Sequence, residues 1–247
     1  AAWDHVVPLG ILGSGTFSTT VSNLQKGKLY FFRVAAENSV GSILSQRVGV
    51  FTTQPEVPVP GLWEFCFNGT FSDTNLDPID SGSGYLTAAV APINTSIWSS
   101  NQGFGFNEND MRSRSGGQFS NDYYGMAWSG ALVVGGSSPV DAGQVSFGTS
   151  SDDGSVLWID LNQNAVFDPS EMVIDNKGLH GVVNRVATVT LSEGNYKWAA
   201  GFYELTGGAY MGVRWKQGPE GNYNNMMFAN PGNGMFQTAA TFPVKSI

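Results

Sequence analysis

Residues 196–203 (YKWAAGFY) and 210–215 (YMGVRW) are the two stretches that decide the fold. Both are rich in aromatic residues, which favour strands. In the second stretch Met211, Val213 and Trp215 fall on one face and polar or smaller residues on the other, which is the alternation of a half-buried strand. The short link between the two stretches contains a glycine pair and is typical of a tight hairpin. The sequence therefore predicts two adjacent antiparallel strands here.

The same pattern recurs along most of the chain. Glycine is abundant, with 32 residues, and no long stretch repeats an apolar residue every three or four positions. This composition predicts an all-β fold with almost no helix, in which many short strands form an antiparallel β-sandwich. From Gly61 to the C-terminus the expected strands are 62–68, 125–134, 144–149, 155–161, 186–191, 195–205 and 209–216.

The charge of the chain argues against two classes of partner. The formal net charge is −8, so the protein repels the phosphate backbone of nucleic acid. The sequence contains no basic cluster and no run of apolar residues long enough for a membrane span. The surplus of carboxylates is instead typical of a protein that works among divalent cations.

The single cysteine, Cys66, cannot form an internal disulfide. It lies in an apolar strand candidate, where a buried structural thiol is the ordinary role. A catalytic thiol needs a base, and the only histidines are His5 and His180. No serine with a placed base, zinc-binding histidine pair or phosphate-binding loop is visible either. We therefore expect a binding module and no enzyme.

The first 53 residues form a separate unit in the sequence. Residues 30–36 alternate as a half-buried strand, and Phe51-Thr52-Thr53 close the segment. The segment resembles the C-terminal half of a fibronectin type III domain, with Tyr30 at the position of the corner tyrosine whose hydroxyl ties back to the preceding loop. The resemblance rests on Leu24, Tyr30, Phe32, Val34, Ala36, Asn38, Gly41 and residues 51–53.

This N-terminal segment is about half the length of a fibronectin type III domain, which has about 100 residues. A half sandwich leaves a sheet edge and a core face uncovered. Either strands that precede residue 1 complete it, or another molecule does, which predicts possible self-association. Residues 54–60, with alternating prolines, are the expected stiff linker, and 61–247 the main domain.

One loop in the main domain has the ligand spacing of a calcium site. Residues 160–171 (DLNQNAVFDPSE) place oxygen-bearing groups at positions one, three, five, seven, nine and twelve of an EF-hand-like loop. Ala165 stands where such loops have the glycine of the sharp turn, and a polar hairpin turn is the alternative. The predicted ligands are Asp160, Asn162, Asn164, the backbone carbonyl of Val166, Asp168 and Glu171.

Two adjacent carboxylates, Asp152 and Asp153, lie at the entrance of a predicted strand. They repel each other unless a cation or hydrogen-bond donors neutralise them. Taken alone, the Asp-Asp-Gly sequence is an ordinary turn. Its surroundings, however, resemble the protective-antigen-like (PA-14) domain, and the resemblance is carried by residues 125–132, 152–160, 173–176, 178–181, 189–196 and 203–215.

The PA-14 resemblance implies a calcium-dependent sugar site. In yeast flocculins and bacterial adhesins of this family, two aspartates joined by a cis peptide bind one calcium ion, which binds vicinal hydroxyls of a sugar. The match places these roles on Asp152 and Asp153. The second calcium-binding loop of the family corresponds here to Thr206, Gly207, Gly208 and Ala209, where backbone carbonyls would serve because Asn and Asp are absent.

The predicted function is therefore a calcium-dependent, glycan-binding, adhesin-like module of a larger secreted or cell-surface protein, bacterial in origin. Two alternatives remain open: a calcium-stiffened structural or assembly module, and an accessory domain of a secreted glycoside hydrolase. Several tyrosines could stack on sugar rings, although packing is their ordinary role. These are Tyr123, Tyr124, Tyr203, Tyr210 and Tyr223.

Overall fold

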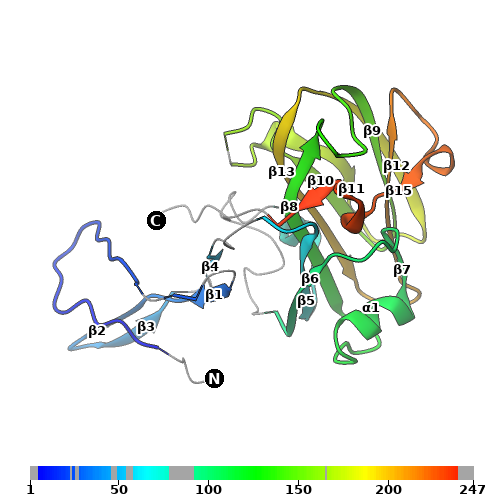
Figure 1. The fold of residues 1–247 in the computed structure, drawn as a ribbon. Coiled ribbons are helices and arrows are strands. Elements are labelled where there is room, and N and C mark those ends of the chain that lie inside the picture. The colour runs from blue at the N-terminus through cyan, green and yellow to red at the C-terminus, as the bar shows by residue number, and fades with distance from the viewer. Residues whose placement is uncertain are drawn as a thin grey trace.

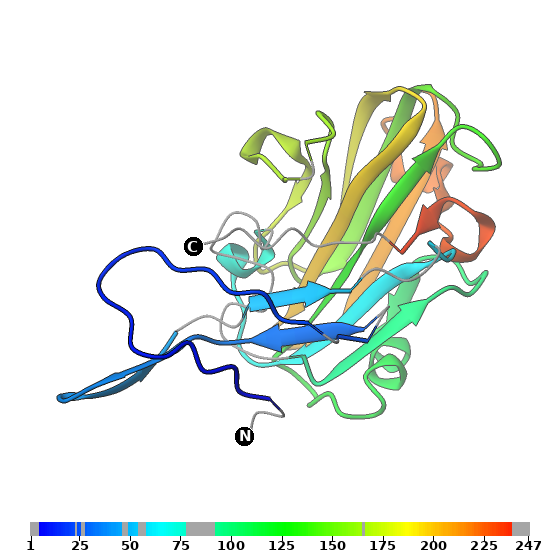
Figure 2. The same cartoon turned by 60° about the vertical axis from the view of Figure 1, so that its left-hand side comes forward.

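Two antiparallel sheets packed face to face form the main domain (Figures 1 and 2). The computed structural model describes residues 5–22, 24–25, 28–45, 49–53, 58–77, 92–164 and 166–238. The expected antiparallel β-sandwich is confirmed. Part of the predicted linker, residues 54–57, lies outside the described residues.

The larger sheet contains most of the long, apolar strands. The central strand β13 pairs with β8 along eleven residues and with β10 on its other side. In order, the sheet consists of β11 (Met172–Asn176), β10 (Ser155–Ile159), β13 (Gly194–Glu204), β8 (Tyr124–Val134), β5 (Leu62–Asn68) and β6 (Asn94–Trp98), with β16 (Phe236–Gln237) added to β8.

The smaller sheet carries the more polar outer face. In order, it consists of β12 (Val183–Leu191), β9 (Gly143–Asp152), β14 (Tyr210–Gln217) and β15 (Met227–Phe228), with β7 (Gly105–Asn107) added to β14. One short α-helix, α1 (Glu108–Arg114), follows β7 and is capped by the side chain of Asn107. Among the described residues no helix is long and apolar enough to cross a membrane.

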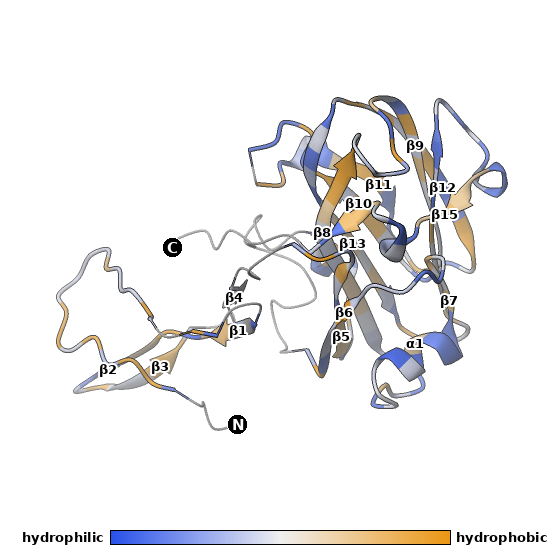
Figure 3. Ribbon diagram, viewed as in Figure 1, coloured by the Kyte–Doolittle hydropathy of each residue, from blue (hydrophilic) through white to orange (hydrophobic). Residues whose placement is uncertain are grey.

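Aromatic side chains fill the space between the sheets. Trp128, Trp198 and Phe147 are fully buried there. A second cluster lies on the outer face of the larger sheet. Here Trp63 and Phe65 of β5 belong to one apolar cluster with Phe71 and Leu76 of the segment that follows β5. Because both faces of the inner strands β5, β8, β10 and β13 are covered, these strands are buried along most of their length. Figure 3 shows hydrophobic colour in this sheet.

The buried carboxylate of Glu64 is the polar centre of the larger sheet. It is 2% exposed, and its Oε2 accepts hydrogen bonds from Arg114 Nε and Trp128 Nε1, each at 2.7 Å. The Arg114 guanidinium also lies over the rings of Trp98 and Phe106, 4.5 and 4.3 Å from their centres. This ion pair therefore joins α1 to the sheet. The neighbouring thiol of Cys66 is buried, as expected, and burial raises its pKa.

The N-terminal segment forms two separate strand pairs, and β2–β3 projects away from the sandwich (Figure 1). The pairs are β1 (Leu29–Phe32) with β4 (Gly49–Thr52) and β2 (Ala35–Asn38) with β3 (Gly41–Leu44). The expectation of one half-buried strand over residues 30–36 is wrong, because the chain leaves the first pair after Phe32 and β2 is fully exposed. The Gln25 N–H does donate to the Tyr30 hydroxyl at 2.8 Å, as a corner tyrosine would accept.

Candidate functional site

The sharp connection between β9 and β10 holds the two predicted aspartates. β9 ends at Asp152, β10 begins at Ser155, and the peptide bond between Asp152 and Asp153 is cis, as the PA-14 resemblance implies. Asp152 is half-buried and lies opposite Tyr210 of β14. Asp153 is only 6% exposed. The two carboxylates thus differ in burial, and Asp152 is the more accessible one.

Backbone donors from two other loops hold the Asp153 carboxylate. Its Oδ1 accepts the N–H of His180 at 3.0 Å, and its Oδ2 accepts the N–H of Leu205 at 3.1 Å. His180 follows β11, and Leu205 follows β13. Asp153 therefore ties together the loops at one end of the sandwich.

Glu204, the last residue of β13, is a site residue that the sequence did not reveal. Its side chain is 0% exposed, and its Oε2 accepts the N–H of Asp153 at 3.1 Å, whereas its Oε1 is buried with no hydrogen-bond partner in the described part of the chain. Burial first, then the charges of Asp153 and Asp152, raise the pKa of Glu204 to about 8. A fully buried carboxylate with an unpaired oxygen calls for a neutralising group.

Further negative charge surrounds Glu204. Burial and the neighbouring Asp153 raise the pKa of Asp152 above its ordinary value. Asp122 lies nearby, where its charge also acts on Glu204 and its Oδ1 accepts the N–H of Gly207 at 3.3 Å. The chemistry of this donor set, all of it carboxylate oxygen, fits a hard cation such as calcium.

The side chains by themselves do not form a complete metal cage. Within the described part of the chain, no group of three or more His, Cys, Asp or Glu side chains is arranged to hold a metal ion. Calcium, however, takes about six to eight oxygen ligands, and backbone carbonyls and water serve as well as carboxylates. Any cation at Asp152 and Asp153 must therefore draw on such oxygens too.

The predicted second loop lies beside the aspartates. Thr206, Gly207 and Gly208 are exposed and Ala209 is partly buried, between the ends of β13 and β14. The preceding residue, Leu205, is the one that binds Asp153. The structure thus brings the loop of residues 206–209 and the aspartates to the same end of the sandwich, although they are more than fifty positions apart in the sequence.

The loop of residues 160–171 begins at the opposite end of β10. Since β10 has five residues, roughly 3.3 Å apart along a strand, this loop starts roughly 17 Å from the aspartates. Asp160 and Glu171 are 2% and 3% exposed. The loop is therefore too distant to contribute ligands to a cation at Asp152 and Asp153.

The side-chain oxygens of the loop of residues 160–171 accept hydrogen bonds from the backbone of the same loop. Asp160 Oδ1 and Asn162 Oδ1 both accept the N–H of Asn164, at 3.1 and 2.9 Å. Glu171 accepts the N–H of Asn162 at Oε1 and that of Asp168 at Oε2, at 3.0 and 2.9 Å. Hydrogen bonds thus connect the five residues whose side chains are predicted ligands, a geometry that suits both a cation loop and a polar turn.

Two features of the loop of residues 160–171 bear on the predicted set of calcium ligands. Ala165, at the position that departs from the EF-hand pattern, lies outside the described residues. The Asp168 carboxylate accepts the side-chain amides of Asn162 and Asn164, at 2.9 and 3.3 Å. Those amides would have to turn their oxygens inward to bind a cation.

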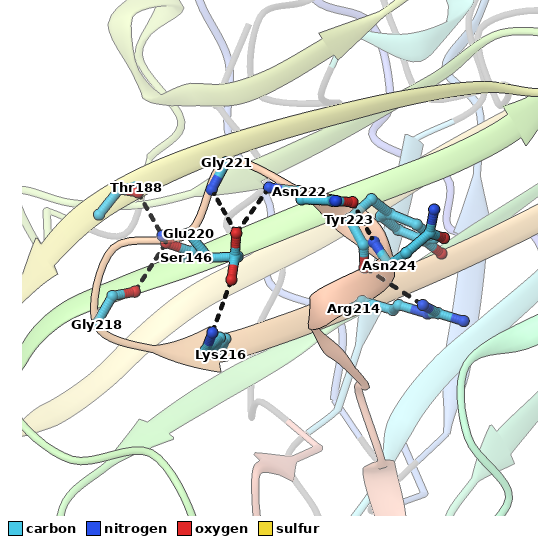
Figure 4. Close-up of polar contacts among 10 residues, drawn as sticks. All are labelled: Ser146, Thr188, Arg214, Lys216, Gly218, Glu220, Gly221, Asn222, Tyr223 and Asn224. Atoms are coloured by element: carbon cyan, nitrogen blue, oxygen red, sulfur yellow. Dashed lines mark hydrogen bonds and ion pairs between the residues drawn. The ribbon is translucent and has the colours of Figure 1, made fainter.

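A third polar cluster lies in the loop that follows β14, and hydrogen bonds within the loop hold it (Figure 4). Glu220 accepts Lys216 Nζ at 2.7 Å and the N–H groups of Gly221 and Asn222 at 3.0 and 2.9 Å, and the hydrogen bonds from Lys216 and Asn222 lower its pKa. The loop lays Tyr223 over the smaller sheet at Gly148, where a Cβ would lie 2.7 Å from the ring. Its polar groups therefore support packing.

Comparison with known proteins supports the fold. No protein-family model matches the sequence, and no curated protein matches it either. The PA14 domain of the MpAFP antifreeze protein superposes with a TM-score of 0.52 at 12% identity, over 78% of this chain and 98% of that domain. This match shows that the chain has a PA14-like fold.

Two further solved structures are similar at a lower level. The epithelial adhesin 9 A domain from Candida glabrata, in complex with Galb1-3GlcNAc, has a TM-score of 0.48 at 13% identity, over 74% of this chain and 95% of that one. The PA14 sugar-binding domain from an RTX adhesin has a TM-score of 0.46 at 16% identity, over 70% and 99%.

Proposed function

We propose that this chain is a calcium-dependent glycan-binding module of a secreted or cell-surface protein. The observation that carries the proposal is the fully buried Glu204 beside the Asp152–Asp153 turn, since its Oε1 has no hydrogen-bond partner among the described residues. A buried charge persists when it is paired or coordinates a metal. A divalent cation would supply the missing partner.

Calcium would link the buried carboxylates to the solvent. Asp153 and Glu204 lie on the buried side of the site, while Asp152 and the exposed loop of residues 206–209 lie toward the solvent. Ligands from the protein would fill part of the coordination shell and leave the outer positions to water. Two vicinal hydroxyls of a sugar can replace two of these water molecules, since both are hard oxygen ligands.

We also propose a second, structural calcium in the loop of residues 160–171. Its support is the ligand spacing together with the buried Asp160 and Glu171 at the two ends of the loop. This calcium would hold the loop between β10 and β11 in place. The ring of Phe167 in this loop packs against Trp158, with ring centres 6.0 Å apart. This second calcium favours the structural-module alternative for this part of the chain without opposing sugar binding at the other end of β10.

The glycan proposal is tested by screening the protein on a glycan array in the presence of calcium and again with excess chelator. We expect binding to a subset of glycans in calcium and none with chelator, because the cation would make the hydroxyl contacts. Binding that persists undiminished in chelator would refute the proposal.

Glu171→Gln is expected to remove the contribution of the loop of residues 160–171 to calcium-dependent stability. A ligand at about one hundred times its Kd stabilises a protein by about 2.7 kcal/mol per site, so the calcium-induced rise in Tm should shrink by several degrees. Differential scanning calorimetry with and without calcium measures the change. The matched control is Glu193→Gln on the exposed turn before β13, and an equal calcium response in both variants would argue for a plain polar turn.

A further inference from the structure

Tyr123 has an unusual backbone conformation beside the candidate site. Its φ is +61°, and among the described residues only one other non-glycine residue, Gln163, has a positive φ. A bulky side chain rarely adopts this left-handed region, because Cβ approaches the backbone. Such outliers persist where surrounding contacts determine them, and they concentrate at functional sites.

Hydrogen bonds on both sides fix the Tyr123 backbone. Its N–H donates to the carbonyl of Leu205 at 3.0 Å, and its carbonyl accepts the N–H of Gly69 at 2.8 Å. The next residue, Tyr124, is fully buried and stacks on Phe119, with ring centres 4.3 Å apart. The conformation therefore separates two adjacent tyrosines, one in the core and one at the surface.

The Tyr123 side chain remains 46% exposed. The other tyrosines named as possible sugar contacts are less available: Tyr124, Tyr203 and Tyr223 are at most 5% exposed, and Tyr210 is partly buried. An exposed ring on a fixed backbone is suited to contact a ligand, because the backbone that carries it is already ordered before the ligand binds.

Tyr123 is connected to the proposed calcium site through its hydrogen-bond partner Leu205 and its neighbour Asp122. Leu205, whose carbonyl binds Tyr123, donates its own N–H to Asp153 Oδ2. The residue before Tyr123 is Asp122, whose carboxylate accepts the N–H of Gly207 in the loop beside the aspartates. Tyr123 is thus one residue away, through hydrogen bonds, from the groups that hold Asp153.

We propose that Tyr123 is a sugar-contacting residue whose ring packs against the C–H face of the pyranose that binds calcium. The inference rests on the proposed function and adds an orienting contact to it. Calcium would select vicinal hydroxyls on one edge of the ring. The electron-rich face of Tyr123 would select the apolar C–H groups on the flat side of the same ring. Together the two contacts fix how the sugar lies.

The test compares Tyr123→Ala and Tyr123→Phe with the unchanged protein in saturating calcium. The probes are the methyl pyranosides of glucose, galactose, mannose and fucose, titrated by calorimetry and by NMR. Tyr123→Ala is expected to weaken binding about threefold to tenfold, the range of an aromatic stacking contact. It should also abolish the upfield shift of the sugar C–H protons. Tyr123→Phe should retain both the sugar affinity and the upfield shift.

Two further variants separate recognition from stability. Tyr123→Gly is expected to bind sugar as weakly as Tyr123→Ala but to melt at a higher temperature, since glycine adopts a positive φ without steric cost. Met227→Ala removes a side chain that is 61% exposed on β15, outside the site, and should bind sugar normally. In all variants the calcium-induced rise in Tm should be unchanged.

Three results would overturn the inference. Unchanged sugar affinity in Tyr123→Ala would show that the ring makes no contact. Loss of the calcium-induced rise in Tm in that variant would show that Tyr123 only supports the calcium site. Failure of every probe and of every glycan on the array to bind the unchanged protein would refute this inference together with the glycan proposal, whereas either of the first two results leaves that proposal standing.

Discussion

Glu204→Gln is expected to remove the calcium response of the Asp152–Asp153 site and to make the calcium-free protein more stable. The amide keeps the shape of the side chain, and its oxygen can still accept the N–H of Asp153. It removes, however, the buried negative charge that the cation would neutralise. The measurement is a thermal melt with calcium and with chelator. It is made in a Glu171→Gln background, so that calcium binding by the loop of residues 160–171 does not contribute.

The pH dependence of the calcium-free protein gives an independent check. Folding raises the pKa of Glu204 from its ordinary value of 4.5 to about 8, so between these values the native state binds more protons than the unfolded state. Stability must therefore fall as the pH rises through this range. In chelator, Glu204→Gln should flatten this decline between pH 5 and 8, and its advantage over the unchanged protein should be greatest at the upper end.

Glu193→Gln is the matched control for Glu204→Gln, because Glu193 is exposed and lies at the other end of β13. It should leave both the calcium response and the pH dependence unchanged. A Glu204→Gln variant that keeps its full calcium response would exclude Glu204 as a ligand. One that loses stability in chelator would show that the carboxylate is needed for folding.

Glu64→Ala is expected to destabilise the sandwich by about 3–5 kcal/mol, the usual cost of removing one partner from a buried ion pair. The Arg114 guanidinium, whose side chain is 16% exposed, would lose its carboxylate, and Trp128 Nε1 would lose its acceptor. The packing of α1 against β6 and β7 depends on the same arginine. Urea unfolding followed by tryptophan fluorescence measures the loss.

The control for Glu64→Ala lies in α1, the helix that carries Arg114. Glu108 pairs with Arg112 four residues later, and the side chains are 37% and 25% exposed, so Glu108→Ala should cost at most about 0.5 kcal/mol. If the two alanine variants unfold at the same urea concentration, the ion pair at Glu64 does not stabilise the fold as described.

The long strands of the sandwich could be predicted because their own residues carry the pattern. β13 and β14 alternate or run continuously apolar within one segment, and the structure places both where the sequence does. The missed strands are β6, β7, β11, β15 and β16, which have two to five residues each. Three residues such as those of β7 have no period, and only pairing with β14 makes them a strand.

The candidate site was partly visible in the sequence. Asp152 and Asp153 stand out as neighbours, and the resemblance pointed to residues 206–209. Glu204 gave no such signal, because a single carboxylate at the end of an apolar strand ordinarily faces solvent. Only the pairing of β10 with β13 turns it toward the Asp153 backbone. The calcium ions, the glycan, self-association of the N-terminal segment and its fibronectin resemblance stay predictions.

The most direct test of calcium-dependent glycan binding is calorimetry with a sugar that binds on the array, using Asp153→Asn and Asp141→Asn. Asp141 is an exposed carboxylate outside the site and serves as the matched control. We expect the unchanged protein and Asp141→Asn to bind sugar equally in calcium and neither to bind in chelator, while Asp153→Asn fails in both. Equal sugar affinity in Asp153→Asn, or affinity that chelator leaves intact, would contradict the account.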